Sequence, residues 1–228
     1  MNCPVTGFVQ VLRKDMCDDV IVCFGDSLTE GDGDSNPGAF DKSLSYPAFL
    51  QTMLYAVVVN AGRCGDTAQA ARARFERDVL SKKPRAVIVE FGANDFFCGR
   101  PVSDVKADLL AVICGIRRAG AQIFLVSFTG NAETQAAFKA NMDYGGGSGF
   151  GERLCEYRKM FDELFRENPD AAPVINFWDD VYTDPSCMSR DRIHPLTKGY
   201  SKIARNVFNS IAGYLPASCL LPCGAAPT

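Results

Sequence analysis

Histidine is almost absent from this 228-residue chain, which contains only His194. A single imidazole excludes every zinc site that requires two histidine ligands, and any acid–base chemistry by histidine must use His194. Basic residues are not in excess either, since 24 Lys and Arg stand against 27 Asp and Glu and give a formal net charge of −3. Nucleic-acid-binding surfaces usually carry a basic stripe, so we do not expect nucleic acid as a partner.

Long apolar runs are also missing. No stretch approaches the roughly 18 consecutive apolar residues of a membrane-spanning helix, so we expect no integral membrane segment. The first 19 residues include Lys14, Asp15, Asp18 and Asp19 and lack the apolar core of a secretory signal, which favours a cytoplasmic location. The sequence does not indicate an oligomeric state.

The ten cysteines are irregularly spaced and form no C-x-x-C motif. We interpret them as reduced thiols that pack as small apolar residues, as is typical of cytoplasmic proteins. Cys219 and Cys223 are the closest pair, but no second pair and no histidine lies near them in the sequence. We therefore expect no metal site.

Short apolar segments alternate with helix-like segments along the chain. The expected strands are residues 20–24, 56–60, 86–91, 122–127 and 174–177, and the expected helices are residues 67–80, 103–119, 151–166 and 197–214. This alternation favours a parallel sheet with helices on both faces, which is a three-layer α/β/α domain. We place that domain at residues 18–215, between an N-terminal extension of residues 1–17 and a C-terminal tail of residues 216–228.

Two segments interrupt the alternation. Residues 31–45 are polar and rich in turn-forming residues, and residues 130–151 include several glycines near their end. Each is either a solvated loop or a border of the active site, because loops after parallel strands hold ligands in such folds. Neither contains a G-x-G-x-x-G or P-loop motif, so we expect no nucleotide and no other cofactor.

Four polar segments lie beside the expected elements: GDSLTEG at residues 25–31, NAGRCGDT at 60–67, GAND at 92–95 and DRIHP at 191–195. Each also has an ordinary structural interpretation. Ser27 and Glu30 match a helix capping box, the next two segments are typical of turns, and a lone histidine before a helix is usually a surface residue. A capping box introduces an apolar helical run, however, whereas Gly-Asp-Gly-Asp follows Glu30, which weakens that interpretation of Ser27.

Three of the segments also carry groups suited to nucleophilic catalysis. Asp191 lies three residues before His194 and can fold back within one turn to accept its Nδ1–H, which leaves Nε2 as a base. A helix that starts at Asp66 or Thr67 leaves nearby N–H groups without partners, and such groups suit an anion. Asn94 adds a neutral amide donor.

In this order, the four segments resemble the blocks of the GDSL, or SGNH, hydrolase superfamily. The resemblance implies a flavodoxin-like sheet of five parallel strands in the order 2-1-3-4-5. It also implies that Ser27 is the nucleophile, His194 the general base and Asp191 its orienting acid. The implied oxyanion hole consists of the N–H groups of Ser27 and Gly65 and the side-chain amide of Asn94.

The glycine of the second block is assigned to Gly65 rather than Gly62, because the family pattern Gly-x-Ser/Thr matches residues 65–67. The segments VVNA…GDT, VEFGAND and YPAFL look most like the bacterial thioesterase, lysophospholipase and arylesterase branch. This implies a serine hydrolase that cleaves small-molecule carboxylic esters or thioesters through an acyl-enzyme. A carbohydrate O-acetyl esterase on the same scaffold is the alternative. Phe96 and Phe97 follow the third block and either line an apolar acyl site or pack beneath it.

Two other classes of protein stay open. Cys64 and Cys98 lie beside the second and third blocks, which would suit a thiol or redox enzyme, although neither has a histidine near it in the sequence. The second class is a non-catalytic, flavodoxin-like binding module. The joint presence of Ser27, Gly65, Asn94, Asp191 and His194 argues against it.

Overall fold

The computed structural model describes residues 17–31, 41–129, 136, 149–174 and 176–221. Its centre is one sheet of five parallel strands in the order β2-β1-β3-β4-β5, as the resemblance implied. The strands are β1 (Val20–Gly25), β2 (Val57–Gly62), β3 (Ala86–Glu90), β4 (Gln122–Val126) and β5 (Ala171–Val174). The expected fold class is confirmed.

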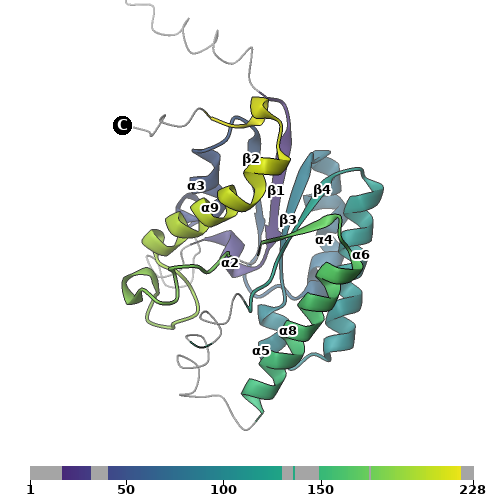
Figure 1. The fold of residues 1–228 in the computed structure, drawn as a ribbon, viewed down its shortest axis with the longest axis vertical. Helices are drawn as coiled ribbons and strands as arrows, with labels where there is room; N and C mark the ends of the chain where they lie inside the picture. The colour runs from purple at the N-terminus through teal and green to yellow at the C-terminus, as the bar shows by residue number, and fades with distance from the viewer. Residues whose placement is uncertain (1–16, 32–40, 130–135, 137–148, 175, 222–228) are drawn as a thin grey trace, which may run out of the picture.

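Helices cover both faces of the sheet and give the three layers seen in Figure 1. On one face, α3 (Tyr46–Gln51) contacts α9 (Thr197–Ile211). On the other face, α6 (Val102–Arg118) lies between α4 (Ala68–Asp78) and α8 (Phe150–Glu167). Short helices α2 (Ser27–Glu30) and α5 (Ala93–Phe97) follow β1 and β3, and 3-10 turns occur at η2 (Lys42–Leu44), η3 (Leu80–Lys82) and η4 (Pro185–Cys187).

The inner strands are apolar apart from Gln122 at the start of β4 and Glu90 at the end of β3, because helices cover both of their faces. Every residue of β3 is buried, as is all of β1 after Val20. Gly120 follows α6 at a φ of +73°, the left-handed conformation that commonly ends a helix. The apolar positions at helical spacing on α6 are all buried against the core, namely Val105, Leu109, Val112, Ile113 and Ile116.

The fifth strand lies earlier in the chain than expected. The apolar residues 174–177 predict a strand, but the strand is Ala171–Val174, which pairs with β4. Phe177 and Trp178 lie in turns and are buried against each other, with ring centroids 5.0 Å apart. The prediction was wrong because these aromatic residues are buried by packing outside the sheet. The real strand lies at the sheet edge, where an exposed Pro173 is tolerated.

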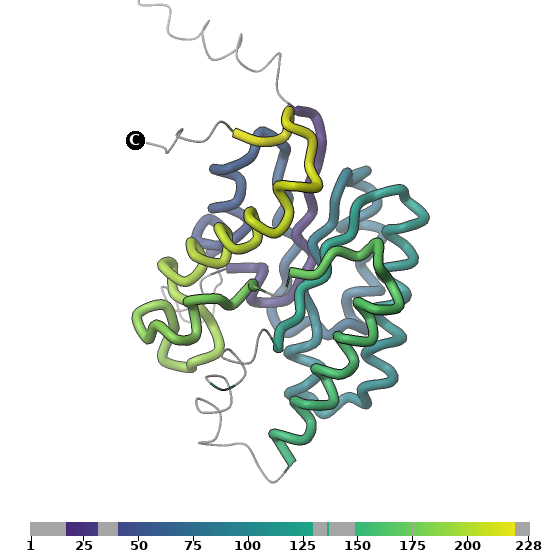
Figure 2. Tube along the Cα trace, in the orientation of Figure 1, coloured from purple at the N-terminus to yellow at the C-terminus, as the bar shows by residue number. Residues whose placement is uncertain are grey.

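The end of the described chain packs back on the domain. Helix α9 ends before the predicted residue 214, and the 3-10 turns η5 (Ala212–Tyr214) and η6 (Ala217–Cys219) follow. The N–H of Tyr55 donates to the carbonyl of Cys219 over 2.8 Å, and Leu54 forms a β-bridge with Leu220. Figure 2 shows this segment beside the start of β1 and the connection from α3 to β2. The packed unit therefore continues past residue 215.

Of the two segments that interrupt the alternation, residues 32–40, 130–135 and 137–148 lie outside the described residues. In the part of the chain that is described, no helix is both long enough and apolar enough to cross a bilayer.

Candidate active site

Ser27 lies at the carboxyl end of β1 as the first residue of α2. Asp26 caps this helix, because its Oδ1 accepts the N–H of Leu28 over 2.9 Å. The capping-box interpretation of Ser27 and Glu30 is therefore wrong. The Glu30 carboxylate instead accepts the N–H of Cys64 over 2.6 Å. This leaves the Ser27 hydroxyl for another partner.

That partner is His194. Oγ of Ser27 lies 2.8 Å from Nε2 of His194, and Nδ1 of His194 lies 2.6 Å from Oδ2 of Asp191. Oδ1 of Asp191 accepts the hydroxyl of Ser189 over 2.6 Å and the N–H groups of Ile193 and His194 over 2.8 and 2.9 Å. The fold thus brings a hydroxyl, an imidazole and a carboxylate into one hydrogen-bonded series.

The carboxyl of Asp191 is held in its ionised form. Burial alone raises its pKa, but the hydrogen bonds from His194, Ser189 and the backbone together hold the pKa well below the usual range. A carboxylate here fixes the proton of the imidazole on Nδ1 and favours the imidazolium when it forms. The tight turn between the two residues places Arg192 at a φ of +59°, in the left-handed region.

Gly65 and Asn94 line the same cavity as Ser27 and His194. Nδ2 of Asn94 donates to Oδ2 of Asp26 over 2.9 Å and to the carbonyl of Asp66 over 3.0 Å. Gly65 has a φ of +77° in the turn that precedes α4. Within the described residues, the N–H groups of Ser27 and Gly65 have no acceptor in the protein.

The other glycine considered for this position, Gly62, ends β2 and does not line the cavity. Helix α4 starts at one of the two N-caps that the sequence suggested, since Oγ1 of Thr67 accepts the N–H of Ala70 over 3.2 Å.

The cavity has a volume of about 140 Å³, and Phe97 forms part of its wall. Phe97 is 44% exposed, whereas Phe96 is 3% exposed and does not line the cavity. Phe96 instead packs edge-to-face against Phe97, Phe150 and Tyr157. Of the two phenylalanines, the structure places Phe97 at the cavity and Phe96 beneath it.

Arg74 is a buried cation that the sequence reasoning missed. Its side chain is 5% exposed, and its guanidinium donates to Oδ2 of Asp66 over 2.5 Å and to the carbonyls of Gly25 and Ala61 over 2.9 and 2.7 Å. Arg74 therefore joins the ends of β1 and β2 to the turn that carries Gly65. Nothing in the helical pattern of residues 67–80 distinguishes this arginine from the exposed arginines beside it.

Cys64 also lines the cavity, but its surroundings oppose a reactive thiolate. Burial, followed by the charges of three nearby carboxylates, raises the pKa of Cys64, whereas a nucleophilic cysteine requires a lowered one. Cys98 is exposed and does not line the cavity. His194, the one imidazole of the chain, is bonded to the Ser27 hydroxyl. The geometry therefore does not support a thiol enzyme.

Among the described residues, one group of side chains has ligand atoms close enough together to hold a metal ion, namely Cys17, Asp19 and Cys219. The two Sγ atoms are 2.8 Å apart, and each is 3.2 Å from Oδ2 of Asp19. Nε of Arg85 lies 3.3 Å from the same oxygen and opposes a cation at this position. Cys223, the other member of the closest sequence pair, lies outside the described residues.

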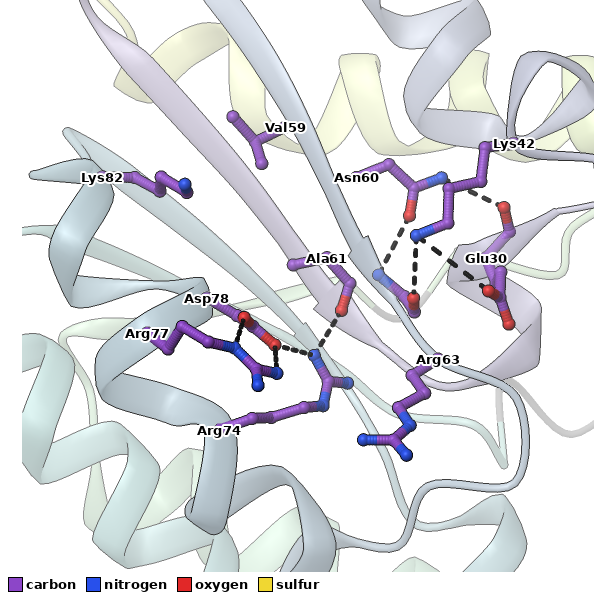
Figure 3. A pocket seen from close by; sticks show the side chains of 11 residues that line it. Glu30, Lys42, Val59, Asn60, Ala61, Arg63, Arg74, Arg77, Asp78 and Lys82 are labelled. Atoms are coloured by element: carbon purple, nitrogen blue, oxygen red, sulfur yellow. Dashed lines mark hydrogen bonds and ion pairs between the residues drawn. The ribbon is translucent and has the colours of Figure 1, made fainter.

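A larger cavity of about 400 Å³ lies along β2 at the outer edge of the sheet (Figure 3). Three of its cations face carboxylates: Arg74 and Arg77 pair with Asp78 on α4, and Lys42 approaches Glu30 on the other side of β2. The described residues that line it include no serine, cysteine or histidine, and none of them lines the Ser27 cavity. We therefore assign the chemistry to the smaller cavity.

A serine, an imidazole and a carboxylate in hydrogen-bonded series, at the carboxyl edge of a parallel α/β sheet, are the features of an α/β serine hydrolase. The chain belongs to the GDSL-like lipase/acylhydrolase family, whose model matches residues 23–202. It is a GDSL-type ester hydrolase that acts on small-molecule esters.

The proteins to which the chain is similar in sequence include a thioesterase and two esterases. The chain is 28% identical to thioesterase 1/protease 1/lysophospholipase L1 of Escherichia coli (strain K12) over 180 residues, 78% of this chain and 76% of that protein. It is 31% identical to esterase TesA of Pseudomonas aeruginosa, over 81% of this chain and 86% of that protein. It is 25% identical to an acetylxylan esterase of Geobacillus stearothermophilus, over 84% of this chain and 93% of that protein. A crystal structure of TesA superposes with a TM-score of 0.69 at 23% identity, covering 86% of this chain and all of that one.

Proposed function

We propose that Ser27, His194 and Asp191 transfer acyl groups to water from small-molecule carboxylic esters or thioesters. The observation that carries this proposal is the hydrogen-bonded series from the Ser27 hydroxyl, through both nitrogens of His194, to the Asp191 carboxylate. No cofactor takes part in the proposed steps.

Ser27 Oγ attacks the carbonyl carbon while Nε2 of His194 takes the hydroxyl proton. The Asp191 carboxylate stabilises the imidazolium, which then gives its proton to the leaving alcohol or thiol. The acyl group remains on Ser27 as an ester. A water molecule, deprotonated by His194, attacks that ester, releases the acid and restores the serine.

The tetrahedral oxyanion of each step is proposed to bind the N–H groups of Ser27 and Gly65 and the amide of Asn94. Two observations support this role: the three groups border one cavity with His194, and both backbone N–H groups lack an acceptor within the described residues. The two backbone donors are fixed before the reaction and stabilise the developing charge without reorganisation at the moment of attack. Both N–H groups of the Asn94 amide already have acceptors, Oδ2 of Asp26 and the carbonyl of Asp66, so the oxyanion is proposed to take the place of the Asp66 carbonyl.

The acyl group is proposed to contact Phe97, whose ring is exposed at the cavity. Relatives named as a thioesterase and as an esterase favour acyl esters and thioesters. The acetylxylan esterase among the relatives favours a sugar acetate as the second candidate. A series of p-nitrophenyl esters of rising chain length, acyl thioesters and acetylated xylose oligomers separates these two substrate classes.

The nucleophile is tested with Ser27→Ala and a fluorophosphonate label. We expect turnover to fall by at least about 10³-fold, and the label to modify the parent protein but not the variant. Ser103→Ala, which removes an exposed serine on α6, is the matched control and keeps parental activity. Parental hydrolysis by Ser27→Ala, or labelling of that variant, contradicts the proposal.

A further inference from the structure

Two carboxyl groups are buried directly beneath the proposed nucleophile. Asp26 precedes Ser27 and is fully buried, and Glu90, the last residue of β3, is 1% exposed. The register of β1 and β3 places Gly25 opposite Glu90, and the N–H of Asp26 is 3.4 Å from Oε2 of Glu90. Gly25 permits this approach, because a Cβ at that position would lie 2.6 Å from Oε2 of Glu90.

The two carboxyl groups differ in how many of their oxygens accept a hydrogen bond: both do in Asp26, but only one does in Glu90. Oδ1 of Asp26 accepts the N–H of Leu28 and Oδ2 accepts the amide of Asn94, each over 2.9 Å. Oε2 of Glu90 accepts the Thr29 hydroxyl over 3.0 Å. Oε1 of Glu90 is buried and has no hydrogen-bond partner among the described residues. A buried ionised carboxylate with a bare oxygen is costly, whereas the neutral acid brings no charge into the low-dielectric interior.

Among the described residues, no positive side chain compensates two negative charges at this position. The titratable groups around the pair on neighbouring elements are Cys23, Tyr46, Cys64, Asp95, Tyr182 and His194. Only His194 among them becomes a cation, when it takes the serine proton. Arg74 donates to the Gly25 carbonyl nearby, but its charge is paired with Asp66 and Asp78.

We propose that Asp26 and Glu90 hold one proton between them, carried by Glu90, and that Glu90 is thereby a positioning residue that acts through Asp26 on Asn94. The role of Asn94 rests on the function proposed above, whereas the shared proton does not. The neutral Glu90 leaves Asp26 as a single anion that accepts neutral donors on both of its oxygens.

The surroundings of each carboxyl group support this assignment. Burial, followed by the charge of Asp26, raises the pKa of Glu90 well above its usual value. Burial also raises the pKa of Asp26, to about 6, but hydrogen bonds from the Leu28 N–H and from Glu90 oppose that rise. The proton therefore resides on Glu90 at neutral pH. The two groups titrate as one pair.

The shared proton has two consequences for catalysis. Ionised Asp26 holds one N–H of Asn94 and caps α2, so it fixes both an oxyanion donor and the turn that carries Ser27. The pair contributes one negative charge beneath the reacting carbonyl in place of two. A second charge would oppose the oxyanion that Asn94 and the backbone stabilise.

Glu90→Gln tests the proposal because glutamine mimics a neutral carboxylic acid with a hydrogen-bond donor. We expect Glu90→Gln to keep kcat/KM for a short p-nitrophenyl ester within about threefold at pH 7.5, since its amide replaces the O–H donor. Asp26→Asn, which turns an acceptor into a donor facing other donors, is expected to lower kcat by about 10²-fold or more. Glu163→Gln, at a half-buried glutamate paired with Lys106 outside the cavity, is the control and changes neither value.

Infrared spectroscopy tests the proton directly, without turnover. Ser27→Ala protein at pH 7.5 is expected to show the carbonyl stretch of a protonated carboxylic acid. The double variant with Glu90→Gln is expected to lack that band, and the one with Glu163→Gln to keep it. Absence of the band in Ser27→Ala at pH 7.5 overturns the shared proton, whatever the activity results are.

Loss of more than about 10²-fold in kcat by a folded Glu90→Gln protein, with the band present in Ser27→Ala, overturns the positioning role. If Ser27→Ala itself hydrolyses esters at the parental rate, the proposed function fails while the infrared result still decides whether the proton is shared.

Discussion

Oγ of Ser27 lies 2.8 Å from Nε2 of His194, although 167 residues separate them in the chain. Two local features produce this contact. The cap by Asp26 turns the chain after β1 so that the Ser27 hydroxyl faces the cavity, and the turn at residues 191–194 folds the imidazole back onto its carboxylate. Nucleophile and base therefore stand at hydrogen-bonding distance before any substrate binds.

Asp191→Asn is expected to lower kcat by about 10²–10⁴-fold, because a neutral amide neither stabilises the imidazolium nor fixes its tautomer. Asp184→Asn is the matched control, since that carboxylate pairs with Lys198 and Lys202 on the same side of α9. Initial rates with a p-nitrophenyl ester measure both variants. Equal activity of the two would contradict the orienting role of Asp191.

The low pKa of Asp191 determines how this carboxylate affects the pH dependence of kcat/KM. Although burial raises its pKa, the hydrogen bonds to Asp191 hold the pKa below its usual value, so it stays ionised as the pH falls through 5 and 4. The acid limb of the kcat/KM profile of the parent therefore does not report the titration of Asp191.

Asn94→Ala is expected to lower kcat by about 10²–10³-fold with little change in KM, because the lost donor acts mainly on the transition state. Asn206→Ala removes an amide that binds the carbonyls of Phe177 and Asp179, outside the cavity, and controls for loss of an asparagine. Steady-state kinetics on short esters give the two constants separately. A rise in KM alone would assign Asn94 to ground-state binding.

The sequence predicted the fold class, four of the five strands and the segments at the site, because these depend on local patterns. Alternating apolar runs mark buried strands, and Asp191-x-x-His194 brings its own pair together within one turn. Arg74 and Glu90 were missed for the opposite reason. Each is a charged residue on an ordinary helix or strand, and only the three-dimensional structure shows that neighbouring elements bury it. The fifth strand was misplaced because Phe177 and Trp178 are buried outside the sheet.

Phe97→Ala is expected to raise KM for p-nitrophenyl butyrate and hexanoate more than for the acetate, because longer acyl chains lose apolar contact with the ring. Each methylene that loses its contact costs about 0.8 kcal/mol, or roughly fourfold in affinity. Tyr214→Ala, at an exposed aromatic residue outside the cavity, is the control. Equal changes for all chain lengths would remove Phe97 from the acyl site.

Arg74→Gln is expected to lower the free energy of unfolding by about 3–5 kcal/mol, because it removes the buried cation of Asp66 and leaves only the exposed Arg63, 3.8 Å from that carboxylate. Arg77→Gln, on the same helix, breaks a pair with Asp78 in which the arginine is 72% exposed, and is expected to cost at most about 1 kcal/mol. Urea denaturation of both variants measures the difference. Similar losses for the two would show that burial of Arg74 adds nothing to its pairing.

The pair of Asp26 and Glu90 predicts how stability depends on pH. Burial raises the pKa of Glu90 well above its usual value, so at neutral pH the folded protein binds a proton that the unfolded chain has released. The contribution of this proton to stability is fully present below about pH 4, near the ordinary pKa of glutamate, and is lost as the pH rises toward the raised pKa. Glu90→Gln removes this dependence.

The stability of Glu90→Gln relative to the parent should therefore increase with pH, by up to about 1.4 kcal/mol per pH unit for one proton. Urea denaturation at pH 6.5, 7.5 and 8.5 measures this slope. Glu163→Gln provides the contrast, because the hydrogen bond from Lys106 lowers the pKa of Glu163. The stability of this variant should run parallel to that of the parent above pH 6. Parallel curves for the parent and Glu90→Gln would mean that Glu90 is ionised in the folded protein.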